Sequence, residues 1–217
     1  MRFGGDAVMA RWTIPEPIPI DWQMRDLSTA KVTVRDLDDG RQQRIIEHAP
    51  LPGVKPHMML WFLRHIDRHL EWRGMIMLAY RYWHPTDHIF FKILGTPGPG
   101  CRFHIVEAFQ ANPKYLIDIS FDVPKLDLTG FRLEFRRLGQ IITSMDEDFE
   151  DIPEGMRYKV TMTIGSTAPL LRTVTRLVRE RLLAKTLDAW HLHNVQEVGN
   201  LPHFLPDLYA AHAEKRP

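Results

Sequence analysis

The stretch PLLRTVTRLVRERLLAKTLDAWHLHNVQEVG, residues 169–199, decides the fold class because the period of the chain changes where it begins. Upstream segments alternate apolar and polar residues, which is typical of half-buried strands. Within the stretch, apolar residues recur at helical intervals: Leu171, Val174, Val178, Leu182 and Leu187. We therefore expect a helix from about Pro169 to Val198, with Gly199 as its C-cap.

The segments before this helix predict an antiparallel meander of strands separated by turns. The strand-like segments are residues 28–37, 41–50, 75–84, 88–94, 101–110, 114–123, 131–149 and 156–165. In 101–110, alternation places Phe103, Ile105, Glu107 and Phe109 on one side of the strand. A shorter helix is expected to start near Pro56 and to end at Gly74.

Together these elements predict one α+β domain, in which a curved antiparallel sheet wraps around a long C-terminal helix. Residues 1–50 form an extended, proline-containing arm and the first strands, and residues 51–217 complete the same domain. A sheet of this shape encloses a cavity between its concave face and the helix, which is a natural small-molecule site.

The composition argues against several classes of partner. With 28 basic and 27 acidic residues the formal net charge is +1, so no global field favours nucleic acid or anionic lipid. The basic helical run 176–185 lacks interleaved aromatic residues and is read as a solvated face. The single cysteine, Cys101, excludes a disulfide framework and a cysteine zinc cluster. With no signal peptide and no apolar run near the roughly 18 residues of a membrane span, we expect a cytoplasmic protein, and a homodimer is compatible with the sequence.

Three places carry residues suited to chemistry. Glu107 lies on an apolar strand face, where an ionised carboxylate is costly unless it is compensated. His193 and Glu197 stand four apart, so one helix face presents an imidazole and a carboxylate that can close on one metal ion. His84 and His88 bracket a proline-containing turn.

Each place also has a simpler interpretation. Glu107 is satisfied if an arginine or solvent reaches it, and His193 with Glu197 is satisfied as a solvated pair. A further pair, His65 and His69, has metal-ligand spacing but is surrounded by charged residues, which favours a solvated polar face. Taken together, one of the turn histidines and the other three residues make a two-histidine, two-carboxylate set suited to zinc, with manganese and iron compatible too. Asp87 could orient one of these histidines by accepting its second N–H.

Four segments resemble, in order, segments of the 2,4-diacetylphloroglucinol hydrolase family. They are PGVKPHMMLWFLRH (52–65), YRYWHPTDH (80–88), RFHIVEAF (102–109) and HNVQEVGNLPHFLPDLY (193–209). The resemblance implies a helix-grip fold, as in START and Bet v 1-like proteins, and one catalytic Zn²⁺ held by two histidines and two glutamates. Carried over by position, the metal ligands are His88, Glu107, His193 and Glu197, with His88 preferred to His84.

The same resemblance implies a hydrolase that cleaves the C–C bond between an acyl group and a phenolic, polyketide-like ring. It makes His84 the candidate acid that protonates the ring carbon, with Tyr158 as a second candidate, and it places Tyr80 in the substrate pocket. The family's characterised enzyme has a further pocket histidine where this chain has none between His104 and His191, so diacetylphloroglucinol itself is not implied as the substrate. The competing hypothesis is a non-catalytic carrier of hydrophobic small molecules with the same fold.

Overall fold

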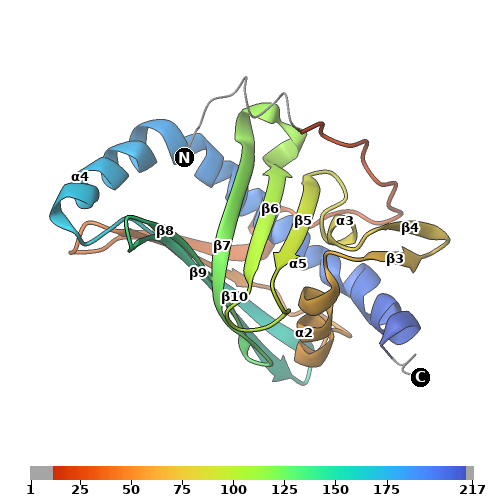
Figure 1. Ribbon diagram of the computed structural model, residues 1–217. Coiled ribbons are helices and arrows are strands. Elements are labelled where there is room, and N and C mark those ends of the chain that lie inside the picture. The colour runs from red at the N-terminus through yellow and green to blue at the C-terminus, as the bar shows by residue number, and fades with distance from the viewer. Residues whose placement is uncertain (1–11, 214–217) are drawn as a thin grey trace.

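The computed structural model describes residues 12–213, which form a large antiparallel sheet and a long C-terminal helix that crosses it (Figure 1). The eight strands lie in the order β1-β2-β10-β9-β8-β7-β6-β5. Their bounds are β1 Ala30–Asp36, β2 Gln42–His48, β5 His88–Leu94, β6 Arg102–Ala108, β7 Leu116–Asp127, β8 Gly130–Arg137, β9 Gln140–Ile152 and β10 Gly155–Ile164. The predicted α+β class is confirmed.

A small hairpin and the helices complete the fold. The hairpin consists of β3 (His69–Trp72) and β4 (Met75–Leu78), and short 3₁₀ turns occur at Leu27–Thr29, Phe109–Ala111 and Pro113–Tyr115. The helices are α2 (Pro56–His65), α3 (Tyr80–Trp83), α4 (Pro169–Val178) and α5 (Ala184–His212), with a π-helical turn, Arg179–Leu183, between α4 and α5. Among the described residues no helix is both long and apolar enough to cross a membrane.

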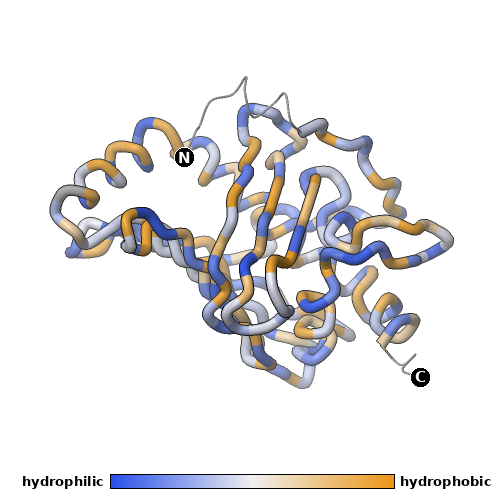
Figure 2. The backbone as a smooth tube through the Cα atoms, in the orientation of Figure 1, coloured by the Kyte–Doolittle hydropathy of each residue, from blue (hydrophilic) through white to orange (hydrophobic). Residues whose placement is uncertain are grey.

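The alternation of the strands sets which side chains face α5. The alternating colours along β5, β6 and β7 in Figure 2 follow this pattern. On β6, Phe103, Ile105 and Glu107 face the interior, whereas His104 on the opposite face contacts Asp118 through a 2.7 Å hydrogen bond. The predicted faces of this strand are therefore confirmed.

The interior along α5 has two parts. Near its C-terminal end, Phe204 packs edge-on against Phe62 and Trp72, with ring centroids 5.4 and 6.3 Å apart, and forms a dense aromatic core with α2 and the hairpin. Nearer its N-terminal end, α5 faces the concave side of the sheet across a cavity. His193 and Glu197 lie where the core gives way to this cavity.

Contrary to the prediction, the long helix does not end at Gly199 but continues through two prolines to His212. The glycine is needed for a different reason. A Cβ at this position would lie 2.4 Å from Cδ and 2.6 Å from Cγ of Arg25. Arg25 belongs to the N-terminal arm and donates to the carbonyls of Ala49 and Pro50, each at 3.0 Å. Gly199 therefore lets the arm lie against the helix.

Contrary to the prediction, residues 75–84 do not form one strand. The chain leaves the hairpin at Leu78 and makes the single helical turn α3. The turn is held by tertiary contacts, because the Tyr80 amide donates to the Ile66 carbonyl and Tyr82 Oη donates to the Leu70 and Met75 carbonyls.

Two other predicted boundaries are corrected. The helix that starts at Pro56 ends at His65 rather than at Gly74, which lies in the hairpin turn with φ 77°. The predicted strand 131–149 is two strands, since Leu138 and Gly139 adopt φ 49° and 74° and turn the chain between β8 and β9.

The Gly199–Arg25 contact yields a first prediction. Replacing Gly199 by Ala should destabilise the protein by about 1–3 kcal/mol, because the added methyl overpacks against Arg25. In an Arg25→Gly background the same replacement should stabilise instead, since Ala is favoured over Gly inside a helix by about 1 kcal/mol. Urea unfolding of the four proteins measures both effects, and a more stable Gly199→Ala single variant would contradict the close approach.

Candidate metal centre

A cavity of about 150 Å³ lies between the concave face of the sheet and α5. Its wall is mostly apolar and aromatic, with side chains such as Phe103, Phe109 and Phe131. A cavity of this size accommodates about one aromatic ring. Polar groups also face it, among them Tyr80, Glu107, Glu147, His193 and Glu197.

His88 is fully buried beside this cavity. It is paired with Glu107 across β5 and β6, and a register shift between His88 and Phe90 marks a bulge at this point. Its Nδ1 lies 2.8 Å from the Tyr80 carbonyl and donates to it, so the lone pair of the neutral ring is on Nε2. Among the described residues Nε2 has no hydrogen-bond partner.

Two carboxylate oxygens face that lone pair. His88 Nε2 lies 3.5 Å from Glu107 Oε1 and 3.4 Å from Glu197 Oε2. A neutral imidazole nitrogen and two carboxylates are all acceptors, so their approach in a buried site requires a cation or protons among them.

His193 faces the same carboxylates from the helix side. Its Nδ1 donates to Asp87 Oδ2 at 2.9 Å, and its Nε2 lies 3.7 Å from Glu107 Oε2 and 3.7 Å from Glu197 Oε2. The helical spacing of His193 and Glu197 puts both on the face of α5 that meets the sheet. The Nε2 atoms of both histidines and both carboxylates therefore gather at one end of the cavity.

The electrostatics of this group follow from burial. Burial raises the pKa of Glu107 and raises that of Glu197 to about 8. Although burial opposes it, the two glutamates raise the pKa of His193 to about 9. Burial, aided by the neighbouring His193, lowers the pKa of His88 well below its usual value. At neutral pH these shifts favour a proton on His193 and on Glu197, so protons compensate the buried charge where no cation is bound.

Further hydrogen bonds hold the glutamates in place. Tyr80 Oη donates to Glu107 Oε1, and the Tyr80 ring stacks on His88 with centroids 3.6 Å apart. Asn194 Nδ2 donates to Glu197 Oε1 at 2.8 Å, and Asn194 Oδ1 accepts from His48 Nε2 at 3.2 Å.

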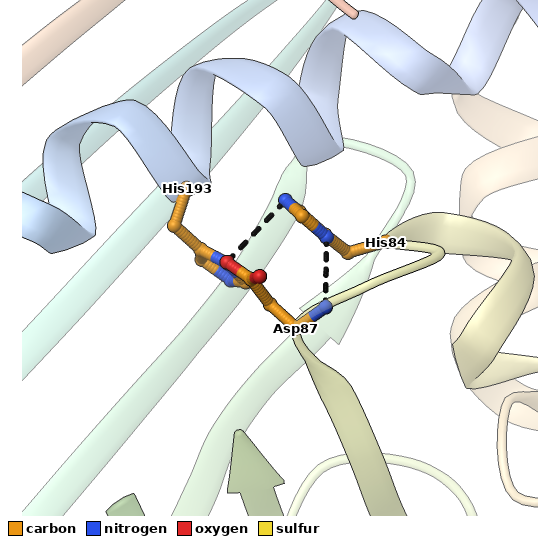
Figure 3. Close-up of side chains that lie close together, drawn as sticks. All are labelled: His84, Asp87 and His193. Atoms are coloured by element: carbon orange, nitrogen blue, oxygen red, sulfur yellow. Dashed lines mark hydrogen bonds and ion pairs between the residues drawn. The ribbon is translucent and has the colours of Figure 1, made fainter. Parts of the chain in front are cut away.

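A second cluster, His84, Asp87 and His193, has metal-ligand proximity but different hydrogen bonding (Figure 3). His84 Nδ1 accepts from the Asp87 amide at 3.1 Å, and His84 Nε2 lies 3.3 Å from Gln196 Oε1. The Asp87 carboxylate also accepts from the amides of Gln110 and Ala111, each at 2.9 Å. Because both nitrogens of His84 and both carboxylate oxygens of Asp87 have hydrogen-bond partners, these two residues support His193 without needing an ion.

The structure brings together four of the predicted residues, His88, Glu107, His193 and Glu197, and it puts Tyr80 on the cavity wall. The two predicted acids lie elsewhere. His84 stacks on the far side of His193, with centroids 4.6 Å apart, and does not line the cavity. Tyr158 donates its hydroxyl to Glu147 and does not line the cavity either.

Glu147 is the buried acid that the sequence reasoning missed. It lies on β9 between Met145 and Phe149, which point to the same side of the sheet. The apolar alternation that drew attention to Glu107 also applies here and could have found it. Burial and the charge of Glu197 raise the pKa of Glu147 well above its usual value.

Comparison with known proteins does not identify the chain. No family model and no curated protein matches it. Solved structures match at low identity. EF2215 from Enterococcus faecalis, a conserved protein of unknown function, is 11% identical with a TM-score of 0.47, and the match covers 86% of this chain and 81% of that one. Ms6760 from Mycobacterium smegmatis is 13% identical with a TM-score of 0.44, covering 84% and 100%. Ara h 8.0201 is 14% identical with a TM-score of 0.37, covering 70% and 99%. At these distances the matches say nothing about the function of this chain.

The buried His48 predicts a specific loss of stability in acid. Burial lowers the pKa of His48 to about 3, so the unfolded chain takes up this proton first as the pH falls through about 6.5. The contribution of neutral His48 to the free energy of unfolding is present above that pH and is lost below it. The loss is about 1 kcal/mol between pH 7 and pH 5.5. Urea unfolding with chelator present should show that His48→Gln loses less stability over this interval than the unsubstituted protein. Equal losses would contradict the prediction.

Proposed function

We propose that this protein is a zinc-dependent hydrolase of the helix-grip type, which cleaves the C–C bond between an acyl group and a phenolic ring. One observation carries the proposal: the buried lone pair of His88 Nε2 faces two buried carboxylates and lacks a hydrogen-bond donor among the described residues. A divalent cation would bind the lone pairs of these nitrogen and oxygen atoms. A protein that merely stores an apolar ligand has no need to bury such a group of atoms.

The residues fit such an ion. His88 and His193 would bind it through Nε2, because Nδ1 of each ring already donates to an oxygen, the Tyr80 carbonyl and Asp87 respectively. Glu107 and Glu197 would supply carboxylate oxygens. Two imidazoles and two carboxylates suit zinc, and also manganese or iron. The imidazole–carboxylate contact of His193 with Asp87 is a frequent support of zinc ligands.

The reaction adds one water across the acyl–ring bond. The water oxygen joins the acyl carbon, and the ring carbon leaves with the bonding electrons and takes a proton. A hydroxylated ring tolerates this because a keto tautomer places the electrons on oxygen. A bound divalent ion supplies a water of lowered pKa and a polarising contact for the acyl carbonyl.

The chain's own residues fix the geometry of this step. Asp87 and the Tyr80 carbonyl set the tautomers of the two histidines, and Asn194 orients Glu197. The aromatic wall, including Phe103 and Phe109, packs against a flat ring and keeps bulk water from it. Neither His84 nor Tyr158 lines the cavity, so we give them supporting roles behind His193 and Glu147.

A non-catalytic carrier is the second candidate, and the apolar wall of the cavity favours it. The two candidate functions differ in whether they need a bound metal ion. A carrier would bind apolar ligands with or without metal, and it would remain metal-free after purification.

Metal content is therefore the first test. The protein should hold about one zinc ion per chain after dialysis against buffer with trace zinc. Glu107→Gln and His193→Ala should lower the affinity for zinc at least about tenfold, because each removes a ligand atom. His104→Gln, on the opposite face of the same strand as Glu107, is the matched control and should bind normally. Competition with a fluorescent chelator gives the affinities. Unchanged affinity in both ligand variants would rule out this centre.

The support from Asp87 predicts an effect of its own. Asp87→Asn should lower zinc affinity about 10–100-fold, because the amide no longer stabilises the His193 orientation that presents Nε2. The control is Asp67→Asn, whose carboxylate contacts Lys92 rather than the centre. If Asp87→Asn leaves zinc affinity unchanged, Asp87 does not hold His193 in its ligand orientation.

A further inference from the structure

Glu147 is a carboxyl group in an apolar wall that the metal centre does not use. It projects from the inner face of β9, is 2% exposed and lines the cavity. The carboxylates within 4.0 Å of the Nε2 atoms of His88 and His193 are those of Glu107 and Glu197. Glu147 therefore requires an explanation of its own.

Its contacts within the protein are few. Tyr158 Oη donates to Glu147 Oε2, and in residues 12–213 this is the hydrogen bond that the carboxyl receives. No lysine or arginine of that range forms an ion pair with it. Burying a carboxyl group with so little compensation is unfavourable by several kcal/mol. Such a group is retained where a ligand supplies the missing hydrogen bond.

The position of Glu147 suits recognition of a ring. Neighbouring side chains on the same wall are apolar, with Met145 on the same strand, Phe131 directly across on β8 and Met162 on β10. A flat ring packed against them would lie beside the Glu147 carboxyl, whose Oε1 receives no hydrogen bond from residues 12–213. A carboxyl oxygen accepts a hydrogen bond from a phenolic hydroxyl.

We propose that Glu147 is a specificity-determining residue, which accepts a hydrogen bond from a ring hydroxyl and makes the cavity select hydroxylated over plain aromatic ligands. This inference rests on the proposed function for the class of substrate. It adds the group that recognises the phenolic hydroxyl. Tyr158 acts through Glu147, because its hydroxyl is used to hold that carboxyl.

The test compares two probes that differ in ring hydroxyls alone, trihydroxyacetophenone and acetophenone. Each is titrated calorimetrically into the metal-free full-length protein, so that no turnover intervenes. The unsubstituted protein should bind trihydroxyacetophenone at least about tenfold more tightly, since a site built to pair a hydroxyl rejects the analogue that lacks it. Glu147→Leu should bring the ratio of the two affinities close to one.

Two further variants keep the result interpretable. Asp148→Asn, the next residue along β9 on the opposite, exposed face, is the matched control and should keep the ratio. Glu147→Leu leaves Tyr158 Oη without its acceptor, so a Glu147→Leu/Tyr158→Phe double variant covers the case in which the single variant does not fold. A folded Glu147→Leu or double variant that retains the tenfold preference would overturn the proposal, as would failure of the unsubstituted protein to prefer the hydroxylated probe.

Turnover of trihydroxyacetophenone by the zinc-loaded protein is measured separately. Lost selectivity in Glu147→Leu supports the role of Glu147 even if the unsubstituted protein hydrolyses nothing, a result that would count against the hydrolase alone. Hydrolysis by the unsubstituted protein together with unchanged selectivity in Glu147→Leu would count against the role of Glu147 alone.

Discussion

The arrangement of this protein depends on one electrostatic constraint: two buried imidazole nitrogens and two buried carboxylates share one end of the cavity between the sheet and α5. Within the described residues, His88 Nε2 has no hydrogen-bond donor and lies 3.4 Å from Glu197 Oε2. In a medium of low dielectric constant such a set is unfavourable without positive charge among its members. Hydrogen bonds from the surrounding structure hold these side chains in this arrangement.

Different parts of the chain accept the hydrogen bonds that orient the two histidines. The helical turn α3 supplies the Tyr80 carbonyl for His88, and the loop before β5 supplies Asp87 for His193. The chain after β6 in turn fixes Asp87 through the amides of Gln110 and Ala111. Tertiary hydrogen bonds of this kind rigidify a site, because breaking any one leaves a buried polar group unsatisfied. The same rigidity is needed to present ligands to an ion or to a reacting group.

Much of this could be predicted from local periodicity. The alternation of β6 placed Glu107 among Phe103 and Ile105, and the spacing of four put His193 and Glu197 on one helix face, since both patterns depend on local geometry alone. Extending the first argument to β9 would have found Glu147 as well.

What the sequence did not reveal depends on tertiary contacts. The choice between His84 and His88 could not be made from strand parity, because residues 80–83 form a helical turn held by the remote Ile66 carbonyl and a bulge follows His88. Gly199 was taken for a helix end because the approach of Arg25, from an arm 174 residues earlier, leaves no trace in the local pattern. The roles of His84 and Tyr158 were assigned by resemblance, and the hydrogen bonds to Gln196 and Glu147 direct both side chains elsewhere.

The central claim is that the Nε2 atoms of His88 and His193, together with Glu107 and Glu197, hold one divalent cation. Anomalous X-ray scattering from crystals grown with zinc tests this most directly, by comparing data collected above and below the zinc edge. The account predicts one strong anomalous peak among these four side chains, within bonding distance of both Nε2 atoms. An empty centre, or a peak in the His84–Asp87–His193 cluster instead, would contradict it.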